Sequence, residues 1–259
     1  MISRELLLGY PVTSDDIGRC ADKVMEWVEG GERGRWVGCL NPHSFEVAEQ
    51  DPEFRLALRD ADLLVPDGIG IVLASWLLRG EIRERVTGSD VFRVVNQRLA
   101  ERRGRVFFLG STRHVLKLIA ERIALDWPTI TVAGVYSPPF ASEFSMADSA
   151  AMIAAVNASK SDVLWVGISA PKQEKWIYQH KQEIDVGLIG AVGAVFDFYA
   201  GTIKRSSPLS QSLGLEWFPR LLQEPGRLWR RNFVSNPRFM ARIVAARWAR
   251  RFAQSQGTD

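Results

Sequence analysis

An acidic residue at a strand-to-helix turn, followed by an arginine, is the strongest sign of chemistry in this sequence. Asp67 comes directly after the short apolar run Leu63–Val65, and a second apolar stretch, Ile69–Leu78, follows it. A turn of this kind exposes its side chains at the carboxyl edge of a parallel sheet, where open α/β folds bind their ligands. Asp67 is therefore a candidate general base, with Arg85 as an anion-binding group nearby. The alternative is that Asp67 only caps the following helix.

Two further strand-to-helix turns carry small or polar residues. Gly110 and Ser111 follow an apolar run and can offer backbone N–H groups to a phosphate, although a plain tight turn gives the same pattern. Gly193 and Asp197 follow another such run, where the residues serve either nucleotide binding or close packing.

A lysine and a glutamine open a helix after a fourth apolar run. Pro171 is typical of the first helical position, so Lys172 and Gln173 fall in the first turn. From there they can contact a phosphate or a sugar hydroxyl, or simply remain solvated.

Metal-ligating patterns are weak in this sequence. Asp60-Ala61-Asp62 matches a short pattern by which nucleotide-sugar enzymes hold a divalent cation, but two spaced acids recur often by chance. The three histidines show no metal-ligand spacing. We therefore expect no metal and no cofactor.

Strand-like apolar runs alternate with helical patterns over most of the chain. This alternation predicts an α/β, Rossmann-like fold with a largely parallel sheet and helices on both faces. A short leader and an amphipathic helix are expected within residues 1–35, and a single helical pattern, capped by Ser44, within Phe45–Leu58. Ser89 or Asp90 is expected to cap the next helix. The expected strands are residues 36–40, 63–65, 105–110, 129–136, 162–168 and 186–192.

The charge distribution separates the C-terminal part from the rest. Nine arginines and two glutamates lie between Leu215 and Phe252, which gives this stretch +7 in a chain of 259 residues whose net charge is +3. We expect a catalytic domain over residues 1–205 and an Arg-rich helical appendage over residues 206–259. The appendage calls for an anionic partner, either a membrane surface or a nucleic acid.

Cysteine usage and hydropathy point to a cytoplasmic chain. Two cysteines provide no disulfide framework, which suits a reducing compartment. The N-terminal residues do not match a signal peptide, and the longest apolar runs are too short to span a bilayer.

Longer motifs occur in a fixed order between Gly34 and Arg231: Asn41-Pro42, Asp62–Gly70, Glu84–Asp90, Ala170–Trp176, Phe196–Gly201 and Leu215–Pro225. Together these motifs resemble those of the WecG/TagA/CpsF family of bacterial glycosyltransferases. The resemblance implies an inverting, metal-independent enzyme of cell-surface polysaccharide synthesis. Such an enzyme moves a sugar from a UDP-sugar to a polyprenyl-diphosphate-linked acceptor at the inner face of the plasma membrane.

The resemblance also assigns roles to individual residues. It implies that Asp67 is the general base and that Arg85 holds the donor diphosphate. Two positions depart from the family pattern: Cys39 stands where the family often has threonine, and Ser111 where it usually has a second glycine. These departures bear on a hydrogen bond at Cys39 and on the backbone approach to the ligand at Ser111. The expected substrate-binding residues are Asn41, Cys39, Gly68, Gly110, Ser111, Tyr136, Lys172, Gln173, Gly193, Asp197 and Arg220.

The tail fits a lipid-linked acceptor. In a helix from Arg238 to Phe252, four apolar residues recur every four positions, and arginines lie beside them. Tryptophan, phenylalanine and arginine on one helix suit the surface of an anionic membrane. We expect the chain to act there as a peripheral protein, with a homo-oligomer left open.

Two other functional classes match single features of the sequence. A Rossmann-like oxidoreductase would need the glycine fingerprint, which the sequence lacks. A nucleic-acid-binding protein would use the basic tail, but no recognition motif accompanies the charge, so we expect no nucleic acid partner. The sequence leaves the transferred sugar undetermined, since members of the family use N-acetylmannosamine, its uronic acid or glucose.

Overall fold

The computed structural model describes residues 2–203 and 230–255 of the chain. Eight strands are present within these ranges: β1 Arg4–Leu7, β2 Tyr10–Thr13, β3 Trp36–Leu40, β4 Leu63–Pro66, β5 Arg105–Gly110, β6 Thr131–Tyr136, β7 Val163–Gly167 and β8 Leu188–Ala191. The helices are α1 Ile17–Glu29, α2 Pro42–Ala48, α3 Pro52–Asp60, α4 Ile69–Leu77, α5 Gly88–Glu101, α6 Arg113–Asp126, α7 Met146–Ser159, α8 Lys172–His180, η1 Lys181–Glu183, α9 Val195–Ala200, η2 Arg230–Ser235 and α13 Asn236–Ser255.

The described strands form one sheet in the order β1-β2-β4-β3-β8-β7-β5-β6. Only β1 and β2 pair antiparallel, and every other neighbouring pair is parallel. The predicted α/β fold with a largely parallel sheet is therefore confirmed. The parallel strands β4, β3, β8, β7, β5 and β6 all end at one common edge of the sheet, so the loops that follow them lie along that edge.

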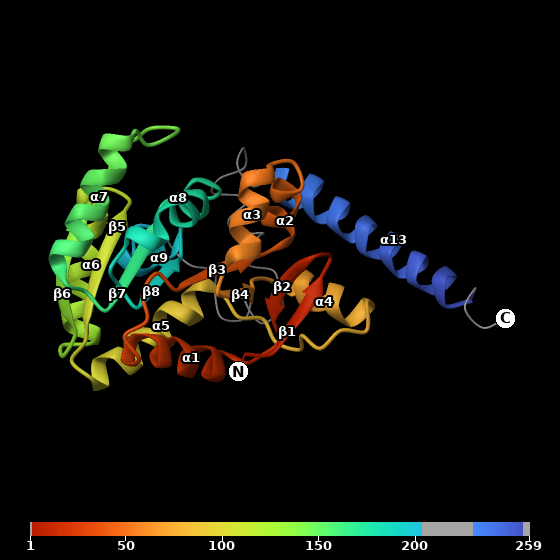
Figure 1. Cartoon of the computed structure of the whole chain (residues 1–259), viewed down its shortest axis with the longest axis horizontal. Coiled ribbons are helices and arrows are strands. Elements are labelled where there is room, and N and C mark those ends of the chain that lie inside the picture. Colours follow the sequence, from red (N-terminus) through yellow and green to blue (C-terminus); the bar gives the residue numbers. More distant parts are fainter. Residues whose placement is uncertain (1, 204–229, 256–259) are drawn as a thin grey trace.

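Helices cover both faces of the sheet (Figure 1). One core packs α2, α3, α4, α7, α8 and α13 on one face, and the other core packs α1, α5, α6 and α9 on the opposite face. The side chains of each strand alternate between these cores, as the period of two in a strand requires. In β7, for example, Leu164 and Val166 face the first core while Trp165 faces the second.

The N-terminal stretch forms a hairpin that the sequence analysis did not foresee. Leu8 and Gly9 connect β1 to β2 and both have positive φ, at 49° and 89°. A two-residue loop of this conformation matches the twist of a hairpin. The expected leader is thus an antiparallel extension of the sheet.

Three local expectations about helices were wrong. The helical pattern of Phe45–Leu58 is broken into α2 and α3, because Asp51 caps a new helix that Pro52 opens. Asn41, and not Ser44, is the N-cap of α2, while Ser44 is its partner in a reciprocal capping box. Thr87 caps α5 in the same way with Asp90, so neither Asp90 nor Ser89 is the cap.

The C-terminal helix α13 packs on the same core as α2 and α4 (Figure 1). Its Phe239 and Ile243 are fully buried there. The expected boundary at residue 206 lies outside the described residues. No helix in the described ranges combines the length and the apolar character that crossing a bilayer requires.

The junction after β5 depends on a glycine. Gly110 has a φ of +125°, and a Cβ there would lie 2.5 Å from the backbone oxygen of Gly167 on the neighbouring strand β7. A side chain at this position is excluded both by the backbone conformation and by a rigid neighbour.

Two alanine substitutions separate these effects. Gly31 also has positive φ, at +69°, but opens to free space, so Gly31→Ala should lower the free energy of unfolding by about 1–2 kcal/mol. Gly110→Ala should cost about 1–3 kcal/mol more, because the added methyl group overpacks the sheet edge. Urea denaturation of both variants measures the difference. Equal costs would contradict the proposed close approach of β5 and β7.

Candidate active site

The loops that follow four adjacent strands bring the main candidates together. Asp67 follows β4, Asn41 follows β3, Gly193 follows β8 and Gln173 follows β7, and these strands are neighbours in this order. The candidates therefore line one continuous part of the carboxyl edge, although up to about 150 residues separate them in sequence.

Asn41 contacts Asp67 directly. The side-chain oxygen of Asn41 accepts the backbone N–H groups of His43 and Ser44, at 3.0 and 2.9 Å. Because these bonds fix which way the amide points, its nitrogen must face outward, and Asn41 Nδ2 donates to Asp67 Oδ2 over 3.4 Å. The Asp67 carboxylate is thus held by an amide N–H₂ group, which donates a hydrogen bond and cannot accept a proton. Any proton removed from a substrate would stay on the carboxylate, an arrangement suited to a general base.

Asp67 does not occupy the capping position of α4. That position is Gly68, with a φ of +107°. The alternative role of Asp67 as helix cap is therefore wrong. The backbone N–H of Asp67 donates to the carbonyl of Leu40 at 2.8 Å, which binds the turn to the end of β3.

The segment that contains Arg85 returns to the same turn. The backbone N–H of Val86 donates to the carbonyl of Pro66 over 3.1 Å, so Arg85 lies next to the end of β4. The following Thr87 begins α5, whose N-terminus approaches the edge of the sheet. A cationic side chain and a helix N-terminus at one place can bind an anion.

Cys39 lies beneath the N-terminus of α5. A Cβ on Gly88 would lie 3.4 Å from Cys39 Sγ and 3.8 Å from the Cα of Val192, so the glycine allows close approach of α5 to β3 and β8. Burial raises the pKa of the Cys39 thiol well above its ordinary value, and the negative charges of Asp67 and Glu174 raise it further. Cys39 therefore remains a neutral thiol and not a nucleophilic thiolate.

Gln173 and Glu174 place unpaired polar atoms at this edge. Both side chains are 4% exposed, and Gln173 Nε2 donates to Glu174 Oε1 at 2.9 Å. Gln173 Oε1 and Glu174 Oε2 are buried and find no hydrogen-bond partner within the described residues. The Gln173 amide lies against Gly193, 3.6 Å from where a Cβ of that glycine would be. Buried acceptors without partners carry a free-energy cost that a bound ligand can relieve.

Glu174 is the residue that the sequence analysis missed. Burial raises the pKa of its carboxyl group to about 6, and the hydrogen bond from Gln173 only partly opposes this. Its place beside Gln173 in the first turn of α8 was legible, but its burial was not, because the sequence does not show what covers a helix N-terminus.

Lys172 and Ser111 are engaged elsewhere. Lys172 Nζ donates to the carbonyl of Ala141 at 2.5 Å and lies 4.1 Å from the ring centroid of Phe144, which directs it toward the loop after β6. The backbone N–H of Ser111 donates to Gly167, and its carbonyl accepts from the hydroxyl of Ser137. The backbone groups of Ser111 thus hold the sheet edge together.

Of three further candidates, one lies far along the sheet, one lies in the helix that follows β8 and one lies outside the described residues. Tyr136 ends β6, five strand spacings or about 24 Å from β4. Asp197 lies in α9, where its backbone carbonyl accepts from Thr202 and Ile203 at the end of the helix. Arg220 lies outside the described residues.

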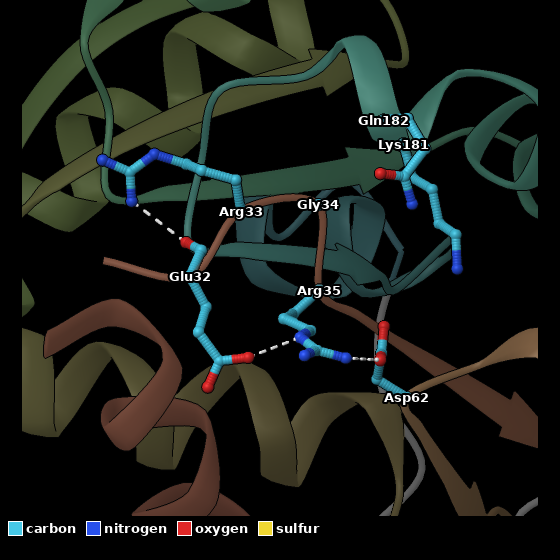
Figure 2. Close-up of a pocket in the computed structure, with 7 residues that line it drawn as sticks. All are labelled: Glu32, Arg33, Gly34, Arg35, Asp62, Lys181 and Gln182. Atoms are coloured by element: carbon cyan, nitrogen blue, oxygen red, sulfur yellow. Dashed lines mark hydrogen bonds and ion pairs between the residues drawn. The ribbon is translucent and has the colours of Figure 1, made fainter. Parts of the chain in front are cut away.

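A cavity of about 330 Å³ opens at the other end of the sheet (Figure 2). Arg35 pairs there with Glu32 and Asp62, each at 2.6 Å, immediately before β3 and β4 begin. Asp60 pairs with Lys181, so both acids of the Asp-x-Asp pattern serve ion pairs of the fold. The described residues contain no group of three or more His, Cys, Asp or Glu side chains that could hold a metal ion.

Comparison with known proteins identifies the family. The sequence profile of the glycosyl transferase WecG/TagA/CpsF family matches residues 5–253. The chain belongs to this family. It is a glycosyltransferase, and the carboxyl edge described above is its candidate active site.

Curated relatives of this glycosyltransferase carry one activity name. A protein of Bacillus spizizenii is 31% identical over 82% of this chain and 79% of its own length. A protein of Bacillus subtilis is 29% identical over 93% and 91%, and one of Staphylococcus aureus is 25% identical over 82% and 80%. Each is named an N-acetylglucosaminyldiphosphoundecaprenol N-acetyl-β-D-mannosaminyltransferase.

The raised pKa of Glu174 predicts a pH dependence of stability. Because the folded-state pKa of about 6 exceeds the ordinary 4.5, the carboxyl group favours the folded state below about pH 4.5. This contribution of about 2 kcal/mol is lost as the pH rises through 6. Glu174→Gln lacks this contribution. Its unfolding free energy at pH 8, taken relative to that at pH 4.5, should therefore be higher than that of the native protein by that amount. Guanidinium unfolding at both pH values tests this, with the exposed Glu121→Gln as control, and an unchanged difference would contradict it.

Proposed function

We propose that this glycosyltransferase moves a sugar from a UDP-sugar to a polyprenyl-diphosphate-linked saccharide with inversion, and that Asp67 is the general base. The observation that carries the proposal is the contact of Asn41 Nδ2 with Asp67 Oδ2 at the carboxyl edge. An acceptor hydroxyl is a poor nucleophile until a positioned carboxylate removes its proton. A single base suits direct displacement, because the acceptor oxygen then attacks the sugar from the face opposite the leaving UDP.

The donor is proposed to bind with its diphosphate near Arg85 and the N-terminus of α5. The leaving UDP gathers negative charge on its diphosphate, which a guanidinium group and backbone N–H groups can stabilise. The position of Val86 against Pro66 supports this, because it keeps Arg85 next to the turn of the base. We propose that neither a metal nor another cofactor takes part.

The unpaired acceptors support a substrate role for Gln173. Its Oε1 atom is buried without a partner in the described structure and lies beside Gly193, at the same edge as Asp67. A hydroxyl or N–H group of the UDP-sugar would donate a hydrogen bond to this atom. Because the atom is buried and otherwise unpaired, that bond would stabilise the complex more than an exposed hydrogen bond does.

The relatives suggest the first substrates to test. Their names specify N-acetylmannosamine transfer to N-acetylglucosaminyldiphosphoundecaprenol. We propose that this chain uses a donor and an acceptor of the same classes, from the inner face of the bacterial plasma membrane, as a peripheral protein. UDP-sugars offered singly with a lipid-diphosphate-sugar acceptor, and product masses read by mass spectrometry, would identify the sugar.

The base assignment predicts the behaviour of Asp67→Asn. Turnover should fall by about 10²–10⁴-fold, because the amide cannot accept the hydroxyl proton. UDP affinity and the unfolding midpoint should change little, since the side chain keeps its shape. Single-turnover transfer and UDP titration measure the two effects, with the exposed Asp22→Asn as the matched control. Near wild-type turnover in Asp67→Asn would refute the assignment of Asp67 as general base.

The diphosphate role predicts a different result for Arg85→Ala. Loss of the guanidinium group should weaken UDP binding and slow transfer together, because both depend on phosphate charge. Calorimetric titration with UDP and with uridine tests this, since uridine lacks the diphosphate and should bind the variant as it binds the native protein. Arg83→Ala removes an exposed arginine two residues away and is the control. If Arg85→Ala binds UDP with the same affinity as the native protein, Arg85 does not bind the donor diphosphate.

A further inference from the structure

Helix α4 begins directly after the catalytic turn and contains no charged residue. Its sequence is Ile-Gly-Ile-Val-Leu-Ala-Ser-Trp-Leu. Ile71 and Ala74 are buried against the core, which accounts for one face. Ile69, Leu73 and Trp76 are 50%, 45% and 67% exposed, and their spacing of four and three residues places them on one stripe. A surface helix normally turns polar residues outward, so this stripe requires a reason.

Helix α13 extends this apolar surface. The two helices pack together at the end of the molecule that carries the β1–β2 hairpin (Figure 1). An Arg247 guanidinium nitrogen donates to the carbonyl of Leu77, the last residue of α4. On either side of that arginine, Val244 and Trp248 of α13 are 48% and 59% exposed. Large apolar side chains are therefore exposed on both of these packed helices, beginning at the turn that holds Asp67.

The charged residues of α13 have one sign. The sequence of α13 contains five arginines and no acidic residue, while α4 is neutral. The segment after α4 carries both signs, with Arg79, Glu81, Arg83 and Glu84 all exposed. An apolar surface with a tryptophan on α4 and another on α13, and with the arginines of α13 alongside, matches the interface of an anionic bilayer, in which tryptophan lies at headgroup depth. A second copy seated on this face would add the arginines of its own α13 to those already there.

We propose that the exposed stripe of α4, together with Val244 and Trp248 of α13, inserts into the headgroup region of an anionic bilayer. This inference rests on the proposed function, because a lipid-linked acceptor is presented at such a surface. It assigns membrane contact to the catalytic domain itself in addition to the basic tail. The bilayer then meets the protein at the helix whose first turn follows Asp67.

Vesicle binding by full-length protein tests the assignment. In Leu73→Gln/Trp76→Gln, affinity for vesicles of phosphatidylcholine and phosphatidylglycerol should fall by roughly tenfold or more, because two apolar side chains no longer leave water. The control pair Leu125→Gln/Phe140→Gln removes exposed apolar side chains on α6 and on the loop after β6, and should bind as the native protein does. Native protein should bind vesicles of phosphatidylcholine alone more weakly. Equal vesicle binding by the two paired variants would overturn the proposal.

Transfer assays separate this inference from the proposed function. With an undecaprenyl acceptor in vesicles, the α4 variant should lose activity in parallel with binding. With a short-chain, water-soluble acceptor it should keep native activity, since α4 contributes no reacting group through Leu73 or Trp76. Absence of transfer by native protein to both acceptors would refute the proposed function, while vesicle binding would still decide the inference.

Two other occupants of the surface have distinct signatures. If a second copy covers it, sedimentation will show an oligomer of native protein that the α4 variant dissociates. The fluorescence of Trp76 is obtained by subtracting the spectrum of Trp76→Phe from that of the native protein. If residues 204–229 cover the surface, this emission will be blue-shifted in the monomer without vesicles. Either result would overturn the proposal. An emission that shifts to the blue only when anionic vesicles are added would support it.

Discussion

The candidate active site depends on the register between β3 and β4. Leu40 pairs with Pro66, and the Asp67 N–H donates to the Leu40 carbonyl, so the two strands end level. Asn41 and Asp67 then emerge side by side. The side-chain oxygen of Asn41 is occupied by the first amides of α2, which leaves its N–H₂ group to face the carboxylate. A single capping residue thereby starts a helix and orients the proposed base, which ties local stability to function.

The rest of the site is built by close approach and by incomplete pairing. Gly88 lets the N-terminus of α5 lie against Cys39, and Gly193 leaves room for the Gln173 amide. Gln173 and Glu174 are buried with one oxygen each unpaired in the described structure. A fold selected only for stability would pair or expose such atoms. Their presence at the carboxyl edge of the sheet, and not in the centre of the core, is what a substrate site leads one to expect.

The sequence predicted much of the fold because alternating strand and helix patterns are local. It also placed Asp67 at a strand-to-helix turn and Gln173 in a first helical turn, both as observed. It named Ser44 as the cap in place of Asn41, because a capping box uses both residues reciprocally. Strand order joins β3 to β8 across about 150 residues, and Glu174 is buried by tertiary packing around the first turn of α8. Such non-local facts leave no periodic trace in the sequence.

Helix α4 connects the chemistry of the site to its surroundings through one rigid element. Nine residues span about 14 Å, so the whole apolar stripe lies within that distance of the turn that holds Asp67. The helix cannot tilt independently, because Ile71 and Ala74 fix one face in the core and Arg247 holds its last carbonyl. A bilayer seated on the stripe would therefore stand at a fixed depth relative to the carboxylate. For an acceptor whose hydrocarbon chain stays in the membrane, that depth would determine which sugar hydroxyl the proposed base reaches.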